Sequence, residues 1–296
     1  MKISIIGSGR VGLSLGAVLA NSGFSVLMTD KEDKKQEVLG KLSFYEPQLK
    51  EYLDKTQDKL EWTRWGEKLL SSDIIFFCLS FPIQKKGDLN LIELFDWIKY
   101  ILDHSKGRKI LVIKSTVPVG THQKIQNIIA DNKKITVVSC PEFLREGYAV
   151  HDLINPQKIV IGSSNQTAVT KLKEIYKKIS KPKQIIQTTP ETAELAKLAY
   201  NSFLGLKISF INEIAGFCEK VQADIDKLKL IIGSDSIREE DFLNQGLGYG
   251  GYCIPRDIET LILSAQKKHQ NMDLLKIAQN INSSLVDYFF KKIKNQ

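Results

Sequence analysis

The segment at residues 246–257, GLGYGGYCIPRD, combines a reactive side chain with a glycine-rich backbone. It holds four glycines, followed by Cys253, Arg256 and Asp257. The glycines permit backbone conformations that are closed to other residues and leave room for a ligand. Cys253 is therefore either a nucleophile, with Asp257 near enough to handle water or a proton and Arg256 as a fixed cation, or a small buried thiol beside a tight turn. The segment alone leaves both interpretations open.

The N-terminal segment GSGRVG has the spacing of a dinucleotide-binding turn. Gly7, Gly9 and Gly12 directly follow an apolar run and precede a helical pattern, and Asp30 ends the next apolar run. In this pattern Gly7 makes the turn, Gly9 lets the backbone approach a pyrophosphate and Gly12 allows close helix packing. Asp30 would accept hydrogen bonds from the adenosine ribose, which favours NAD over NADP because a 2′-phosphate would meet a carboxylate. The alternative is a set of glycines that only turns a tight corner.

Two more polar segments follow apolar runs, KSTVPVGT at residues 114–121 and CPEFLREG at residues 140–147. Ligands of open α/β sheets bind at the carboxyl ends of the strands, so we expect both segments to line the cofactor crevice. The first is otherwise an ordinary strand exit with a proline turn. The second, in which Glu142 and Glu146 flank Arg145, is otherwise a solvated helix start.

Lys197 and Asn201 are four residues apart and share one face of a predicted helix. A lysine on an amphipathic helix is commonly a solvated rim residue. Asn201 lies next to Leu198 and Phe203, where an amide needs a polar partner, and this favours a functional pair.

The elements that must position these residues begin with a series of short apolar, β-branched runs. Between them lie helical stretches, a pattern that predicts a parallel sheet covered on both faces. The fold class is therefore α/β, a Rossmann-type doubly wound parallel sheet, which we expect to form an NAD-binding domain over residues 1–189. The predicted strands are residues 2–6, 25–29, 73–79, 109–113, 135–139, 158–161 and 184–187.

A helical domain is expected over residues 190–296, built on one long helix. Thr189 is a candidate N-cap and Pro190 takes the first helical position, and no further proline interrupts the chain before about Val221. Apolar residues all round such a helix would be explained by a partner subunit, so we expect a homodimer through it. Shorter helices follow, and a last amphipathic helix is predicted over about residues 272–293.

Composition narrows the class of protein. The chain has 296 residues, a net charge of +8 from dispersed lysines, and four cysteines without CxxC spacing, three of them in apolar surroundings. We therefore expect a cytoplasmic enzyme without a disulfide scaffold or a metal site. No basic tract interleaved with aromatic residues predicts nucleic-acid binding, and no apolar run predicts a signal peptide or a membrane span.

Taken together, the motifs resemble the UDP-glucose/GDP-mannose dehydrogenase family. The segments that carry the resemblance fall in that family's order and span essentially the whole chain: GSGRVG, FYEPQL, STVPVGT, PEFLREGYAVHDLINPQKIVIG, AELAKLAYNSFLGLKISFINEIA and GLGYGGYCIPRD. The resemblance implies a four-electron oxidation of a nucleotide-sugar C6 alcohol to a uronate, as in a UDP-glucose 6-dehydrogenase. It further implies two NAD⁺ and a covalent thioester intermediate.

The resemblance also implies roles for single residues. Cys253 would attack the aldehyde, Lys197 and Asn201 would stabilise the oxyanion, and Glu146, Thr116 and Asp257 would position water and move protons. Which of them removes the first proton stays open. The positions that match cofactor contacts are Gly7, Gly9, Val11, Gly12, Asp30, Lys35, Thr116, Glu146 and Arg256. Those that match substrate contacts are Glu142, Phe143, Leu144, Arg145, Lys197, Asn201, Phe242, Leu243, Asn244, Gln245, Gly246 and Gly250.

The sequence departs from the family pattern at several points. Phe81-Pro82 replaces a Thr-Pro pair, Arg256 replaces a lysine, and Arg238 is one position out of register with an arginine that family members contribute to the neighbouring subunit. Family members typically carry a C-terminal domain that closes over the nucleotide, and we expect this chain to lack it, as a truncated form or a short relative.

Two hypotheses follow, with a third of related fold. The chain is an active nucleotide-sugar dehydrogenase, or it is a catalytically impaired NAD-binding dimeric remnant or partner subunit. The joint presence of Cys253, Lys197, Asn201 and Asp257 favours the first. A two-electron hydroxyacid dehydrogenase would explain Lys197 and Asn201 but would leave Cys253 without a role.

Overall fold

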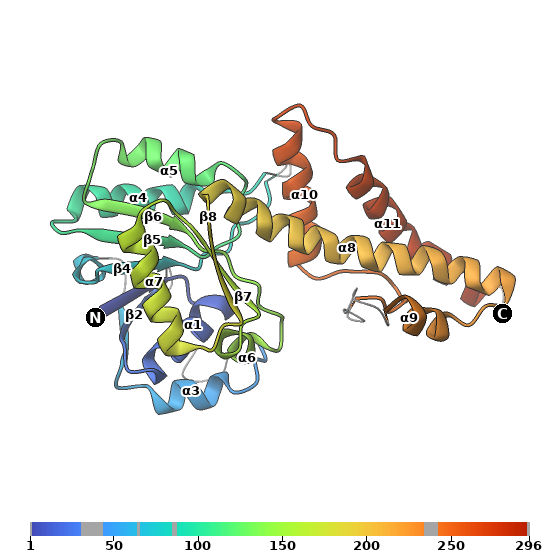
Figure 1. Cartoon of the computed structure of the whole chain (residues 1–296), viewed down its shortest axis with the longest axis horizontal. Helices are drawn as coiled ribbons and strands as arrows, with labels where there is room; N and C mark the ends of the chain where they lie inside the picture. Colours follow the sequence, from blue (N-terminus) through green and yellow to red (C-terminus); the bar gives the residue numbers. More distant parts are fainter. Residues whose placement is uncertain (1, 31–43, 64–65, 85–87, 234–241, 295–296) are drawn as a thin grey trace. The chain divides into compact units, whose positions relative to one another are not determined.

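The computed structural model describes residues 2–30, 44–63, 66–84, 88–233 and 242–294 (Figure 1). The chain forms two compact units, Met1–Gln84 with Leu89–Lys197 and Lys85–Asp88 with Leu198–Gln296. Among the described residues, none of the helices is long and apolar enough to cross a membrane.

The first unit is built on a sheet of eight strands in the order β3-β2-β1-β4-β5-β6-β7-β8. All neighbours pair in parallel except β6 and β7, which are antiparallel. The predicted doubly wound sheet is therefore confirmed, with one reversed pair. The strands are β1 (Lys2–Ile6), β2 (Ser25–Thr29), β3 (Leu60–Thr63), β4 (Ile74–Phe77), β5 (Lys109–Ile113), β6 (Ile135–Ser139), β7 (Lys158–Gly162) and β8 (Gln184–Thr188).

Strand β3 is absent from the sequence prediction, which gave seven strands. It is the edge strand beside β2, and only its first residue, Leu60, is buried. An edge strand with one covered face does not need the continuous apolar run that marks the central strands. Its sequence, LEWT, therefore resembles a loop until the neighbouring strand is known.

Helices cover both faces of this sheet (Figure 1). Alternate strand residues point to opposite faces, so that Ile74 and Phe76 belong to one apolar core and Ile75 and Phe77 to the other. The first core is closed by α1 (Arg10–Asn21), α3 (Leu49–Lys55), α6 (Ala149–Ile154) and α7 (Gln166–Ile179), and the second by α4 (Ile92–His104), α5 (Thr121–Ile129) and the short 3₁₀ helix η1 (Glu67–Ser71). The loops with the predicted site residues follow the carboxyl ends of β1, β5 and β6.

The long helix α8 (Pro190–Val221) has the predicted bounds. Thr189 Oγ1 accepts the backbone N–H of Thr192 at 3.2 Å, which confirms the predicted N-cap. The second unit continues with α9 (Ile225–Gly233), α10 (Cys253–Gln266) and α11 (Asp273–Lys294), so the last helix also lies where the sequence predicted it.

Glu194, in the second turn of α8, ties this helix to the start of α5. Its carboxylate accepts the backbone N–H of Gly120 and of His122, each at 2.7 Å. These donors stabilise the carboxylate, as expected at a helix N-terminus. Burial outweighs them and raises the pKa of Glu194 from 4.5 to about 7. The beginning of α8 therefore depends on a carboxyl group that titrates near neutral pH.

Replacing Glu194 by Gln removes this titration. The pKa is raised in the folded state, so the group's contribution to stability is fully present below about pH 4.5 and is lost as pH rises through about 7. We expect the free energy of unfolding of the wild type to fall relative to E194Q by roughly 3 kcal/mol across this interval. Urea unfolding at several pH values measures the difference. The exposed Glu174→Gln on α7 is the control, and a difference independent of pH would contradict the prediction.

Candidate active site

Glycine stands at three positions of the dinucleotide-type turn for different physical reasons. Gly7 has φ +102°, and a Cβ on it would lie 2.5 Å from the carbonyl oxygen of Cys78. A Cβ on Gly12 would lie 1.9 Å from the carbonyl oxygen of Gly7, whereas one on Gly9 would meet nothing within 4 Å. Packing thus requires two of the glycines, and Gly9 leaves an open backbone at the start of α1. This opening fits the close approach of a pyrophosphate to the first helical amides. Val11, in the same turn, packs against the core.

Asp30 lies beside this turn at the end of β2. Its Oδ2 accepts two hydrogen bonds from Ser8, from the backbone N–H at 2.7 Å and from the hydroxyl at 2.5 Å. The glycine motif predicts no role for Ser8, because it occupies a variable position of the motif. The pair fixes the carboxylate next to the glycine turn, where a ribose would be recognised. Lys35, the other predicted cofactor contact near this strand, lies outside the described residues.

Lys197 and Glu142 form an ion pair that is largely shielded from solvent. Lys197 Nζ lies 3.0 Å from Glu142 Oε1, and Lys197 is only 4% exposed, so it is not a solvated rim residue. Burial opposes the ionisation of Glu142, but Lys197, the backbone N–H of Leu144 and Lys114 outweigh it and lower the pKa of this carboxyl. Lys197 Nζ also lies 5.6 Å from the ring centroid of Phe143. Thr116 is buried at the exit of β5, on the same edge of the sheet.

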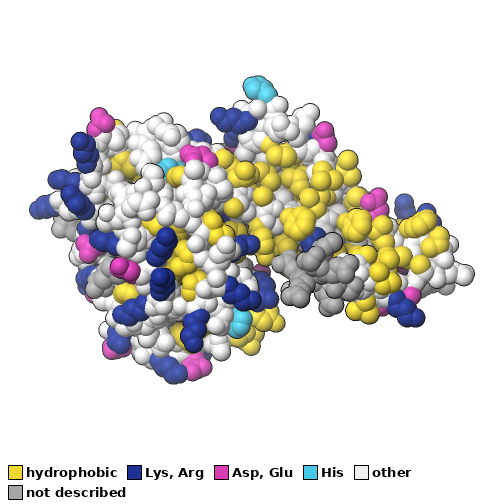
Figure 2. Space-filling view, viewed as in Figure 1, with side chains coloured by type: hydrophobic (Ala, Val, Ile, Leu, Met, Phe, Trp, Pro, Cys, Tyr) yellow, Lys and Arg dark blue, Asp and Glu magenta, His cyan; other side chains and the backbone are white. Residues whose placement is uncertain are grey.

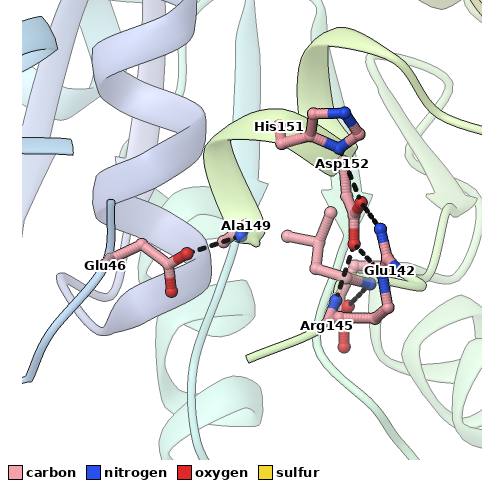
Figure 3. A network of polar contacts seen from close by, with 7 residues as sticks. Glu46, Glu142, Arg145, Ala149, His151 and Asp152 are labelled. Carbon is pink, nitrogen blue, oxygen red and sulfur yellow. Dashed lines mark hydrogen bonds and ion pairs between the residues drawn. The ribbon is translucent and has the colours of Figure 1, made fainter. Parts of the chain in front are cut away.

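The side chain of Arg145 turns toward α6 (Figure 3). It donates from Nε at 3.0 Å and from Nη2 at 2.8 Å to the carboxylate of Asp152, and its guanidinium lies 4.7 Å from the ring centroid of Tyr148. This fork anchors the loop between β6 and α6. Glu146 in the same loop is exposed and pairs with Arg10.

The second unit holds a cluster around Asp257, which is fully buried. Asn201 Nδ2 donates to Asp257 Oδ2 at 2.5 Å, and Arg256 Nε donates to Oδ1 at 2.8 Å. Burial disfavours the charge on Arg256, but Asp257 outweighs it and the pKa of the guanidinium is raised. The amide predicted to need a polar partner therefore has one.

Cys253 is the first residue of α10 and is exposed, whereas Cys78, Cys140 and Cys218 are buried. The interpretation of Cys253 as a small buried thiol is therefore wrong. A helix N-terminus favours negative charge, and the thiolate is the nucleophilic form of cysteine. This position suits a nucleophile.

Two asparagines that the sequence analysis did not single out hold the glycine segment. Asn282 on α11 accepts the backbone N–H of Tyr249 at 2.7 Å and donates to its carbonyl oxygen at 3.0 Å. Asn212 on α8 accepts the backbone N–H of Gly246 at 2.8 Å. Asparagine at these helical positions carries no local signal, so only the fold reveals the contacts. Of the other predicted substrate contacts, Leu243 is buried, Phe242 and Gln245 are partly exposed, and Asn244 and Gly250 are exposed.

Within each unit, the structure thus brings several of the predicted residues together. The doubly wound sheet, the open glycine turn and the ribose-side carboxylate define an NAD-binding α/β dehydrogenase. Residues 1–180 match the model of the UDP-glucose/GDP-mannose dehydrogenase family, NAD binding domain, and residues 191–284 match its central domain. The chain belongs to this family of NAD-dependent oxidoreductases.

Individual relatives agree with this assignment. The chain is 39% identical to UDP-glucose 6-dehydrogenase TuaD of Bacillus subtilis (strain 168) over 274 residues, covering 90% of the chain and 59% of that protein. It is 38% identical to UDP-glucose 6-dehydrogenase YwqF of the same organism over 293 residues, covering 96% of the chain and 66% of that protein.

A UDP-glucose dehydrogenase from Pyrobaculum islandicum superposes with a TM-score of 0.88 at 30% identity, over 95% of this chain and 68% of that one. The chain spans less than two thirds of the length of the two Bacillus relatives.

Alkylation tests the exposure of Cys253 without a substrate. Iodoacetamide is expected to modify Cys253 first in the native protein, because burial shields the other thiols and raises the pKa of Cys78 to about 12. Intact-mass spectrometry with peptide mapping locates the adduct, and Cys253→Ser is expected to lose it. Faster modification of any buried cysteine would contradict the structure of this segment.

Proposed function

We propose that this protein oxidises the C6 alcohol of a nucleotide sugar to the uronate, with a covalent intermediate on Cys253. The observation that carries the proposal is an exposed cysteine at the start of α10, one helical turn before a buried aspartate held by Asn201. The family membership supplies the reaction class. UDP-glucose is the first substrate to test, because it is named in the two Bacillus relatives.

The chemistry divides into two oxidations and one hydrolysis. The C6 alcohol loses a hydride and its hydroxyl proton and becomes an aldehyde. The Cys253 thiolate adds to the aldehyde, and the resulting oxyanion takes up a proton to give a thiohemiacetal. Loss of a second hydride and of the hydroxyl proton gives a thioester, and water releases the uronate and the thiol. Bound NAD⁺ supplies the hydride acceptor in both oxidations. The side chains of this protein hold the reacting groups and move the protons.

Each polar residue has a proposed task in this sequence. Lys197 and Asn201 stabilise the oxyanion that forms when the thiolate adds, as donors already held in place by Glu142 and Asp257. Glu146, with Thr116 and Asp257, positions water and takes a proton during hydrolysis.

We propose the binding roles from the family resemblance. The glycine turn with Val11 and Asp30 holds the cofactor in residues 1–189, and Thr116, Glu146, Arg256 and Lys35 add contacts. The substrate contacts are Glu142 to Arg145, Lys197, Asn201, Phe242 to Gly246 and Gly250. Residues 190–296 form the domain that carries Cys253.

We also propose that two copies of the chain associate through α8. Phe203, Phe210 and Phe217 are all exposed on this helix and are spaced seven residues apart, which places them along one stripe. Figure 2 shows apolar side chains over much of the visible face of the helical unit. A contiguous exposed patch of this kind is typical of a protein interface.

Counting NADH tests the reaction. With UDP-glucose and excess NAD⁺, we expect two NADH for each sugar consumed, measured by absorbance and by quantifying the uronate. Cys253→Ser is expected to lose this stoichiometry while binding NAD⁺ as the wild type does, because the nucleophile does not belong to the dinucleotide turn. NAD⁺ binding without turnover of any UDP- or GDP-sugar would contradict the proposal. It would favour a non-catalytic NAD-binding protein.

A charge in the phenylalanine stripe tests the association. Phe210→Glu is expected to shift the protein from dimer to monomer in multi-angle light scattering, because an interface core does not tolerate an unpaired carboxylate. Lys220→Glu, exposed on the same helix outside the stripe, is the control and is expected to stay dimeric. A monomeric wild type, or a dimeric Phe210→Glu, would contradict the role of this face.

A further inference from the structure

The FYEPQL segment, residues 44–49, has no part in the reaction described so far, yet it holds a buried carboxylate. Glu46 is 4% exposed, and it accepts the backbone N–H of Ala149 at 2.6 Å and of Gly147 at 3.2 Å. Figure 3 shows Glu46 reaching the start of α6. The segment therefore fixes the end of the loop that carries Glu146, about a hundred residues further along the chain.

Side chains of the FYEPQL segment also contact Arg10, which lies between Gly9 and Gly12 in the dinucleotide turn. Arg10 Nε lies 3.4 Å from Glu46 Oε2, an ion-pair distance without hydrogen-bond geometry. The Arg10 guanidinium also lies 5.1 Å from the ring centroid of Phe44. Two side chains of FYEPQL, Glu46 and Phe44, thus contact Arg10 and limit its movement.

Arg10 also forms an ion pair with Glu146. Arg10 Nη2 lies 2.6 Å from Glu146 Oε1, and the side chains of Arg10 and Glu146 are 30% and 73% exposed. Exposed ion pairs are commonly weak, because two long side chains must be ordered to form them. Here Glu46 and Phe44 already order the arginine, so less conformational freedom is lost when Glu146 pairs with it.

We propose that Arg10, held in place by Glu46 and Phe44, is a positioning residue for Glu146. This inference rests on the proposed function, in which Glu146 positions water and takes a proton. Arg10 contacts neither the sugar nor the thiol in this role. It limits the orientations of the Glu146 carboxylate and ties them to the backbone that binds the cofactor.

A double-mutant cycle on turnover tests the proposal. Arg10→Met is expected to lower kcat for NADH formation with UDP-glucose roughly three- to tenfold, with the KM values for both substrates within about twofold. In a Glu146→Gln background the same change is expected to have no further effect. Arg10→Lys is expected to recover part of the activity, since it restores the charge without the fork.

The matched control removes another cation near the same segment. Lys50→Met on α3 breaks an exposed pair with Asp54 and is expected to leave kcat unchanged. An equal loss from Arg10→Met in both backgrounds would overturn the proposal, because Arg10 would then act independently of Glu146. A rise in kcat would also overturn it, since the pair would then restrain Glu146 unproductively.

Hydrogen–deuterium exchange gives a second readout that needs no turnover. Arg10→Met and Glu46→Gln are expected to speed exchange in the peptide that covers Gly147 and Ala149, relative to a peptide from α7. Unchanged exchange in both variants would overturn the restraint. If the wild type oxidises no nucleotide sugar, the proposed function fails, and this measurement still decides whether Arg10 and Glu46 hold the loop.

Discussion

The placement of α8 within each of the two units depends on buried polar side chains, three of which lie on this helix. Glu194, Lys197 and Asn201 stand on successive turns, and all are nearly inaccessible to solvent. A buried charge or amide is costly unless it has a partner. Each has one in its own unit: the first amides of α5, the carboxylate of Glu142 and the carboxylate of Asp257. Within each unit, these partners fix which part of the α8 surface is buried.

The same face shows how environment separates two carboxyl groups. The Glu142 side chain is 13% exposed and Glu194 is 3% exposed, and removal from solvent by itself favours the neutral acid. Glu142 has the Lys197 ammonium beside it, and its pKa is lowered. Glu194 is bound by backbone N–H groups, and its pKa is raised to about 7. A full positive charge offsets desolvation here, and backbone dipoles do so only in part.

The residues suited to chemistry are held before any ligand arrives. Asn201 and Arg256 orient Asp257, and Glu142 orients Lys197. The side-chain amide of Asn282 is hydrogen-bonded to the backbone of Tyr249, four residues before Cys253. Donors fixed in this way need little reorganisation when charge develops. The proposed site residues thus orient one another, and Asn282, which has no part in the proposed reaction, holds the backbone before Cys253.

The sequence by itself determined the elements whose signals are local. Apolar runs marked the central strands, Thr189 and Pro190 marked the start of α8, and the glycine spacing marked the dinucleotide turn. It also revealed the family, because the motifs keep their order. Only the tertiary structure decided the edge strand β3, the reversed pair of β6 and β7, and the exposure of Cys253. It alone revealed the contacts of Glu46, Glu194 and Asn282, whose partners lie 103, 72 and 33 residues away. Such contacts form only when elements far apart in the chain pack together. No residue pattern within one element indicates which distant element it will contact.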